Sequence, residues 1–270
     1  NHVEESMEFS PRNKLEEVLI LAATEPAHRP EFFSELMEAT VFVLGTTDDG
    51  DESGEVVLHA GSNVNIQHWE KDDGSSAIPF FSSLEALQSV ITEEAPFLAL
   101  PTRSLFEMTQ GVTLFLNPKL PYGKEFLPQE IEHILSGEGN GFVQQRVVEE
   151  EMQVILSQPA EMPAQMIDSL TQLFTKHRHV KRAFLAQIQE PGEEQPHLLI
   201  GIDADQDEEV IIREAGSVAS DTLPDERPVD LCLVKDGESG ISHYMIKHTT
   251  PFYERKWGSF LREFKGSGNA

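Results

Sequence analysis

Residues 163–203 read PAQMIDSLTQLFTKHRHVKRAFLAQIQEPGEEQPHLLIGID, and this stretch decides the fold expected for the second half of the chain. Its first part has the apolar period of a helix that packs on one side. The period then changes, and 180–189 and 198–203 predict two strands joined by a turn-rich link at 190–196. The apolar stripe of the helix consists of Met166, Ile167, Leu170, Leu173 and Phe174.

Further elements are predicted on both sides of this helix–strand–strand unit. They are a strand at 152–157 before it, and a helix at 208–219 and a strand at 229–234 after it. The order β-α-β-β-α-β is the ferredoxin-like plan, which contains a split β-α-β unit. We therefore predict a ferredoxin-like domain over 151–265, with extra terminal helices at 241–248 and 252–264.

The first half predicts a mixed α/β domain over residues 11–136. Asn13 with Glu16 marks one helix start, and Ser82 with Glu85 marks another as a capping box, in which Ser82 accepts from the Glu85 amide. The other expected elements are helices from residue 30, at 102–110 and at 127–135, and strands at 40–45, 55–60, 64–70, 77–81, 97–101 and 112–116. The glycine-bearing stretch 136–151 is predicted to link two domains of an α+β protein.

The charge of the chain restricts its partners. Lysine and arginine total 20 and aspartate and glutamate total 47, which gives a formal net charge of -27. So much negative charge repels a phosphate backbone and an anionic membrane surface, so we expect neither nucleic acid nor a membrane as a partner. The acidity is interpreted as a well-hydrated, soluble surface. The alternative is an acidic face for a basic partner protein.

Cysteine content and hydropathy point to the cytoplasm. Cys232 is the single cysteine, so no disulfide can form within the chain, as is usual in a reducing compartment. No apolar run has the length of a membrane span, and the acidic start of the sequence is unlike a secretory signal. We expect a soluble, cytoplasmic protein.

Seven segments, in order along nearly the whole chain, carry a resemblance to one family. They are Ala23–Pro30, Gln67–Glu70, Ile78–Leu87, Ser104–Thr109, Pro163–Leu170, Leu198–Ile202 and Pro251–Arg255. The chain resembles the enhanced-serine-sensitivity protein B (SseB) family in both its N-terminal and its C-terminal domain. The resemblance implies a cytosolic bacterial protein of two domains, named for a serine-sensitivity phenotype. It implies no catalytic residues and no cofactor.

The acidic stretch 203–214 imitates a calcium-binding loop. Asp203, Asp205, Asp207 and Glu214 stand at relative positions 1, 3, 5 and 12. Position 6, which needs glycine for a sharp turn, is Glu208. We therefore favour a strand-to-helix turn with Asp207 as the N-cap over a calcium site.

One basic cluster interrupts the acidic chain and is the candidate anion site. It consists of Lys176, His177, Arg178, His179, Lys181 and Arg182. Metal binding by His177 and His179 lacks the third ligand that zinc needs. The favoured interpretation is that the cluster complements the end of a helix and the edge of a strand.

The sequence contains no convincing catalytic constellation. Cys232 lies among aliphatic residues, which predicts a buried and unreactive thiol. There is no Gly-x-Ser-x-Gly nucleophile motif, and Gly137–Gly141 lacks the lysine and spacing of a phosphate loop. We expect no metal and no cofactor.

Aromatic residues concentrate at the end of the chain, in the helix expected at 252–264. They are Phe252, Tyr253, Trp257, Phe260 and Phe264. Packing onto the second domain is the favoured interpretation. The functional alternative is a docking helix for self-association or for a protein partner.

Three functions remain open. The first is a non-enzymatic protein that binds a partner protein or a small metabolite. The second is a regulator that binds serine or a related amino acid, which needs a cavity with one partner for an ammonium group and one for a carboxylate. The third is an enzyme that uses Cys232 or an unrecognised dyad.

Overall fold

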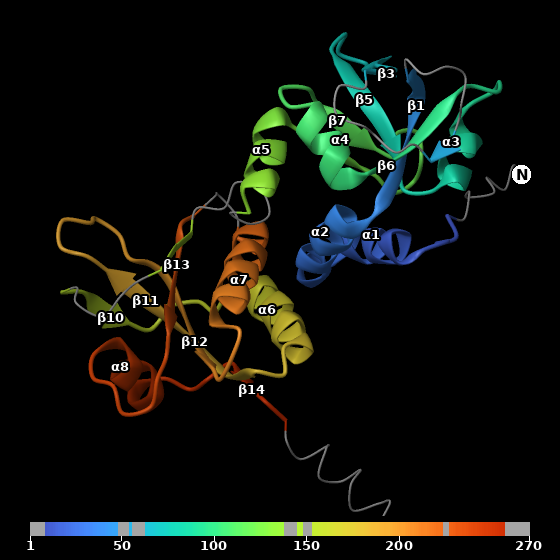
Figure 1. The fold of residues 1–270 in the computed structure, drawn as a ribbon. Coiled ribbons are helices and arrows are strands. Elements are labelled where there is room, and N and C mark those ends of the chain that lie inside the picture. The colour runs from blue at the N-terminus through green and yellow to red at the C-terminus, as the bar shows by residue number, and fades with distance from the viewer. Residues whose placement is uncertain are drawn as a thin grey trace, which may run out of the picture. The chain divides into compact units, whose positions relative to one another are not determined.

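The computed structural model describes residues 9–47, 54–55, 63–137, 145–147, 153–223 and 227–256. Contacts divide the chain into two compact units, Asn1–Phe142 and Val143–Ala270, and each contains helices and its own sheet (Figure 1). The predicted α+β class is confirmed. No helix within the described ranges is long and apolar enough to cross a membrane.

The first unit is built on a sheet whose central strand is β1. The helices are α1 (Lys14–Thr24), η1 (Pro26–His28), α2 (Arg29–Glu38), α3 (Leu84–Val90), α4 (Thr102–Met108) and α5 (Pro128–Ser136). The strands are β1 (Thr40–Thr47), β2 (Gly54–Glu55), β3 (Val64–Ile66), β4 (Trp69–Glu70), β5 (Ser76–Phe81), β6 (Phe97–Pro101), β7 (Leu114–Leu116) and β8 (Lys124–Phe126). The order is β2-β6-β1-β5-β7-β8, with β3 paired to β1 and β4 to β5.

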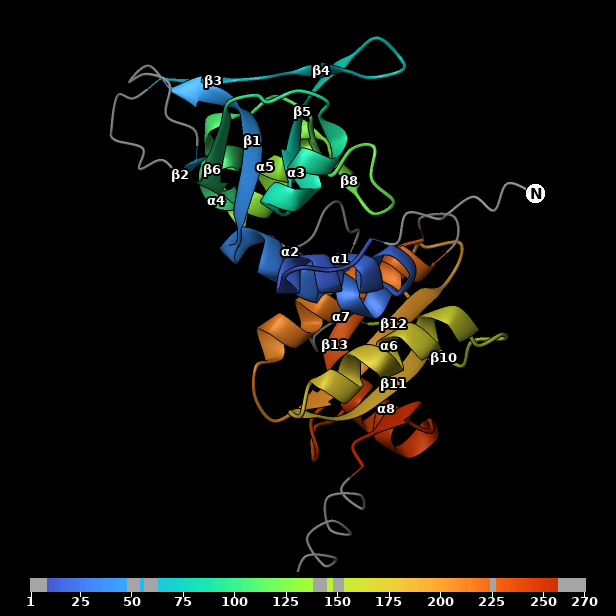
Figure 2. The same ribbon diagram turned by 90° about the vertical axis from the view of Figure 1, so that its right-hand side faces the viewer.

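The main core of this unit lies between the sheet and helices α1 and α2, which pack side by side (Figure 2). Val18 and Leu36 on the helices are fully buried against Val41 and Phe80 on the strands. A smaller cluster around Phe81 and α3 forms a second core. The apolar residues of these two helices therefore face the sheet, as helical periodicity leads one to expect.

The capping box predicted at Ser82 is displaced by one residue. Helix α3 begins at Leu84, and Ser83 is the N-cap that accepts from the Ala86 amide at 3.0 Å. Ser82 instead belongs to a buried polar network. Its hydroxyl donates to Glu16 Oε2 at 3.0 Å and accepts from Asn117 Nδ2 at 2.8 Å. This network joins α1 to two loops of the sheet, which are far apart in the sequence.

The Ser82 network predicts that the effects of substitutions at Ser82 and Glu16 on the unfolding free energy depend on each other. A helix cap at Ser83 predicts no such dependence. Ser82→Ala leaves buried polar partners unsatisfied, which costs about 1–3 kcal/mol of unfolding free energy. Because the two side chains share one hydrogen bond, we expect Ser82→Ala and Glu16→Gln to be non-additive. Ser83→Ala should cost about 1 kcal/mol and add independently to Glu16→Gln. Urea unfolding followed by Trp69 fluorescence, in a Trp257→Phe background, measures the three single variants and the two double variants with Glu16→Gln. Additive losses for Ser82 and Glu16 would contradict this arrangement.

The second unit has three helices and six strands among the described residues. The helices are α6 (Ala164–Lys176), α7 (Glu208–Thr222) and α8 (Ile241–His248). The strands are β9 (Gln145–Val147), β10 (Ile155–Ser157), β11 (Val180–Gln189), β12 (His197–Ala204), β13 (Val229–Leu233) and β14 (Tyr253–Glu254). The order is β10-β11-β12-β13-β9, with β14 paired to β11 beside β10.

The ferredoxin-like arrangement is not confirmed, although the predicted order of elements along the chain is found. A split β-α-β unit needs the two strands that flank α6 to be parallel, with another strand between them. Here β10 and β11 are antiparallel neighbours, and β12 and β13 are parallel neighbours. Propensity and periodicity identify strands, but they do not determine which strands pair. That choice depends on contacts distant in the sequence.

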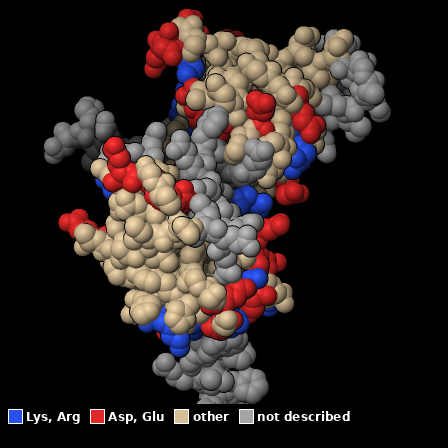
Figure 3. Space-filling view, turned by 90° about the vertical axis from the view of Figure 1, so that its left-hand side faces the viewer, with Lys and Arg blue, Asp and Glu red and all other residues tan. Residues whose placement is uncertain are grey.

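Helices cover both faces of the second sheet. Figure 1 shows α6 and α7 together on one face and α8 on the other. Phe184, Leu199 and Cys232 pack against Met245 on the α8 side. A Cβ atom on Gly201 would lie 2.7 Å from Val234 Cγ2, so glycine permits the close approach of this layer. Seen from the side of β10 and α8, most of the surface of the unit is uncharged, and charges gather at its margins (Figure 3).

The ends of this unit differ in part from the sequence prediction. The stretch 136–151, predicted to link the two domains, contains the division between the units after Phe142, and it also contains β9, which pairs in parallel with β13. The terminal helix expected from Phe252 is not formed at its start, because Tyr253 and Glu254 form β14 against β11. Backbone pairing with an open strand edge prevails there over the helical spacing of the aromatic residues. Residues 257–264 of that predicted helix lie outside the described residues.

Candidate functional site

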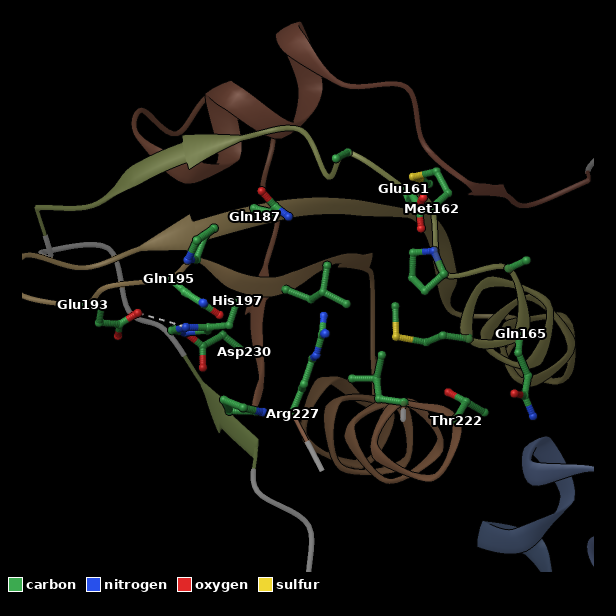
Figure 4. Close-up of a pocket in the computed structure, with 18 of the residues that line it drawn as sticks. Glu161, Met162, Gln165, Gln187, Glu193, Gln195, His197, Thr222, Arg227 and Asp230 are labelled. Carbon is green, nitrogen blue, oxygen red and sulfur yellow. Dashed lines mark hydrogen bonds and ion pairs between the residues drawn. The ribbon is translucent and has the colours of Figure 1, made fainter. Parts of the chain in front are cut away.

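A pocket of about 1220 Å³ lies at the end of the second sheet where β12 and β13 begin. Four chain segments meet there: the loop before α6, the turn between β11 and β12, the end of α7, and the approach to β13 (Figure 4). Its lining within the described residues is 160–166, 187, 193–198, 222–223, 227–228 and 230. Strand ends and helix ends therefore build the site, as is usual for sheets covered on both faces.

The polar centre of the pocket is a histidine between two carboxylates. His197 Nε2 lies 2.6 Å from Asp230 Oδ2, and His197 Nδ1 lies 3.0 Å from Glu193 Oε2 (Figure 4). Asp230 is 2% exposed and stands near the start of β13. Because each ring nitrogen faces an acid, the imidazole ring is fixed in orientation, and both nitrogens are donors only when the ring is charged.

The turn before β12 explains how Glu193 reaches the histidine. Pro191 and Gly192 occupy the two central positions of a β-turn, closed by donation from the Glu193 amide to the Glu190 carbonyl at 3.1 Å. Gly192 has a φ of 89°, which a type II turn requires at that position. Gln189 Nε2 also donates to the Glu193 carbonyl at 2.9 Å. The turn-rich link read from the sequence thus has a defined geometry that aims one acid at the pocket.

Other charged residues in the lining have no hydrogen bond or ion pair with a described residue. Arg227 is exposed, and its side chain extends toward the middle of the pocket (Figure 4). Glu161 and Glu194 are exposed at the rim. Charges that no described residue neutralises can pair with a ligand, so the described lining offers one cationic group and two anionic groups beside the fixed histidine.

The pocket also has an apolar part. Met162, 54% exposed, and Met166 belong to the segment that starts α6, and Leu198 and Leu223 lie on the side of β12 and α7. Methionine side chains adapt their shape to different partners and are frequent in binding surfaces. The combination of flexible apolar side chains with charged groups favours a ligand that is amphipathic.

The described lining lacks the residues of nucleophilic catalysis. It contains no serine, cysteine, lysine or tyrosine. Thr222 is its single hydroxyl residue, and that hydroxyl donates within α7 to the carbonyls of Val218 and Ala219. The histidine therefore has no nucleophile beside it in the part of the pocket that is described.

The predicted anion cluster lies at the opposite end of the sheet, where its cations meet acids. Arg182 donates to Asp203 Oδ2 at 2.9 Å, and His179 Nδ1 lies 2.7 Å from Asp205 Oδ1. His177 pairs with Glu214 on α7. Arg255, which follows β14, joins this cluster by donating to Asp205 Oδ2 at 3.2 Å. Lys176, Arg178 and Lys181 lie in the same region of the chain, and Arg178 supplies its carbonyl to Arg255 Nη1.

Acids of the stretch 203–214, which imitates a calcium-binding loop, are the partners of these cations. Asp203, Asp205 and Glu214 are used in the ion pairs just described, and no group of three potential metal ligands occurs among the described residues. Asp207 is the N-cap of α7, as predicted, but its side chain makes no capping hydrogen bond. The predicted strand-to-helix turn is found between β12 and α7.

Cys232 is buried on β13, 2% exposed, as its aliphatic neighbours predict. The described aromatic residues of the predicted docking set are also packed. Phe252 and Tyr253 lie against Phe174 of α6. The Tyr253 hydroxyl donates to the Phe174 carbonyl at 3.2 Å, and burial raises the pKa of that phenol. Trp257, Phe260 and Phe264 lie outside the described residues.

Sequence reasoning missed the residues that form the pocket. His197, Glu193, Asp230 and Arg227 belong to no motif, and the sheet brings Asp230 next to a histidine 33 positions earlier in the chain. The spacing of Glu193 and His197 around a turn is the one local signal. Their proximity otherwise follows from the parallel pairing of β12 with β13.

Comparisons with known proteins identify the family. A model described as the SseB protein N-terminal domain matches residues 15–133, and one described as the SseB protein C-terminal domain matches residues 148–255. The chain is 56% identical over 254 residues to Protein SseB of Escherichia coli (strain K12), which covers 94% of this chain and 96% of that protein. Protein SseB of Shigella flexneri matches equally. No solved structure matches the chain.

The ion pairs of the second unit predict a pH dependence of stability. Donation from Arg255, followed by His179, holds the pKa of Asp205 below its usual 3.8. Its ionised form therefore stabilises the fold above that value, and the contribution is lost as the pH falls through the lowered pKa. We expect the difference in unfolding free energy between the native chain and Asp205→Asn to be constant above about pH 5 and to shrink toward about pH 3. Denaturant unfolding measures it, with Glu238→Gln, an exposed acid outside the cluster, as the control. A difference that does not vary with pH would refute the assignment.

Proposed function

The chain belongs to the SseB family, and from that premise we propose that it is a non-enzymatic cytosolic protein that binds its partner in the His197 pocket. The observation that carries the proposal is the pocket itself. It joins a fixed Asp230–His197–Glu193 arrangement to charges that no described residue neutralises. Groups placed in this way recognise a ligand by charge and shape.

Binding is favoured over catalysis by what surrounds the histidine. General base catalysis needs a nucleophile or water held within hydrogen-bond reach of a free ring nitrogen. Both nitrogens of His197 already face carboxylates. Cys232, the other candidate for chemistry, is buried on the sheet and is not part of the lining. Full alkylation of Cys232 in the native protein within minutes would revive the enzymatic hypothesis.

The size of the pocket favours a protein segment as the ligand. At about 1220 Å³ it exceeds the roughly 300–1,000 Å³ of pockets for drug-sized molecules. A free amino acid would leave most of that space to water. A peptide segment can place several side chains against Met162, Leu198 and Leu223 while its charges meet the rim.

A serine-binding regulator is the second candidate, and one observation favours it. The pocket holds both groups that a free amino acid requires, since Arg227 can pair with a carboxylate and the acids of the rim can pair with an ammonium group. The family is named for a serine-sensitivity phenotype, which is a reason to test serine as the ligand. The volume of the pocket is the argument against it.

Titration calorimetry with L-serine decides between the two candidates. If the pocket is a serine site, Arg227→Ala removes the carboxylate partner and should weaken binding at least tenfold, about 1.4 kcal/mol. Arg103→Ala, an exposed arginine on α4 of the first unit, is the matched control and should bind as the native chain does. If L-serine gives no heat of binding and no thermal shift, the serine regulator is excluded and the protein-binding proposal stands.

A pull-down from cell lysate tests the protein-binding proposal. Glu161→Lys with Glu194→Lys reverses two exposed charges of the rim without breaking an ion pair among the described residues. We expect this double variant to lose at least nine-tenths of the captured partner. The control reverses Glu93 and Glu94, an exposed acidic pair of the first unit. Equal capture by both variants would contradict the pocket as the binding site.

A truncated chain tests the predicted docking role of Trp257, Phe260 and Phe264. It should end after Lys256 and not at Pro251, because removal of β14 would also remove packing on Phe174. If this truncated chain keeps the thermal midpoint of the native chain but captures no partner, the aromatic segment acts in docking. Unchanged capture would confine binding to the described units.

A further inference from the structure

The lining of the His197 pocket has the chemistry of a receptor for a basic, apolar segment. Acids outnumber bases in it, with Glu161, Glu193, Glu194 and Asp230 against Arg227 and the histidine. The rim acids lie beside the methionines, and Figure 4 places Glu161 and Met162 together at one side and Glu193 at the other. A complementary segment therefore carries positive charges on both sides of large apolar side chains.

Residues 256–265 of this chain, KWGSFLREFK, have that composition. Lys256, Arg262 and Lys265 exceed the single acid Glu263 in a protein whose net charge is -27. Trp257, Phe260 and Phe264 supply the apolar part. In the other basic cluster, at 176–182, three members are already in ion pairs: His177 with Glu214, His179 with Asp205 and Arg182 with Asp203. The C-terminal segment is thus the complementary part of the chain.

The geometry of β14 directs this segment away from the pocket of its own chain. Tyr253 pairs with Ala183, Glu254 with Arg182, and the Arg255 amide donates to the Lys181 carbonyl, so the chain advances toward the start of β11. The pocket touches β11 at Gln187, six residues along the strand and roughly 20 Å away. Trp257 is two residues beyond Arg255, which span about 7 Å at most. Trp257 is therefore too close to Arg255 in the sequence to enter the pocket of its own chain, so the segment as a whole does not fit that pocket.

We propose that residues 256–265 of one copy occupy the His197 pocket of a second copy, so that the protein self-associates through its C-terminal segment. This inference rests on the proposed function, because it names the partner of the same site. The segment leaves the sheet at the end opposite to the pocket, an arrangement that suits exchange between copies. Strand β14 stays on its own chain and anchors the segment through Arg255, which donates to Asp205 and to the Arg178 carbonyl.

Sedimentation equilibrium over a range of concentrations tests the inference with three variants. The first ends after Lys256, the second carries Glu161→Lys and Glu194→Lys, and the control carries Glu93→Lys and Glu94→Lys. We expect the native chain and the control to associate equally. Each of the other two should associate at least tenfold more weakly, with thermal midpoints unchanged. The inference would be overturned if the native and truncated chains showed the same association state at every concentration. Loss of association in the control would also overturn it.

Mixing the two impaired variants tests whether the segment of one chain binds the pocket of another. The truncated chain has an intact pocket and no segment, whereas the charge-reversed chain has an intact segment and an altered pocket. We expect the mixture to form a complex at concentrations where each variant alone is monomeric. No complex in the mixture would overturn the inference. The proposed function is judged separately: if the native chain is monomeric but captures lysate proteins in a manner that depends on the pocket, only the self-association fails. If the charge-reversed chain also captures as the native chain does, both fail.

Discussion

Burial of the central strands on both faces is the constraint on which the second unit depends. Strands β11, β12 and β13 lie between α6 and α7 on one side and α8 on the other, so their middle residues must be apolar or small. Ile200 and Ile202 are fully buried, and Gly201 between them leaves room for Val234 and Met245. A polar group in such a layer costs free energy unless it is paired, which confines polar function to the ends of the strands.

The two ends of that sheet use their polar residues differently. At one end, Arg182, His179 and Arg255 are paired with aspartates, and the pairs fasten β14 and the start of α7 to the sheet. At the other end, His197 is held by Glu193 and Asp230, while Arg227 and the rim acids make no pair with a described residue. The first end is therefore a structural clamp, and the second is available to a ligand. A sequence motif marked the first end, whereas none marked the second.

The first unit shows how a local rule can select the wrong neighbour. Ser82 and Ser83 both satisfy the sequence pattern of an N-cap. Ser83 takes that role, because the buried carboxylate of Glu16 and the amide of Asn117 need the Ser82 hydroxyl. A buried carboxylate without a partner is more costly than a missing cap, so the long-range requirement decides. The rule identified the start of α3 to within one residue, and tertiary structure assigned the two hydroxyls.

The sequence by itself determined the α+β class, nearly all helices and strands of the described residues, the burial of Cys232 and the family. These follow from periodicity, caps, turns and matched segments, which are local properties of the chain. Tertiary structure alone decided that β10 pairs with β11, that Tyr253 joins a strand, and that the basic cluster faces Asp203 and Asp205. It also decided the His197 pocket. Strand pairing and ion pairing join residues tens of positions apart, and no local pattern records which of the possible partners the folded chain brings together.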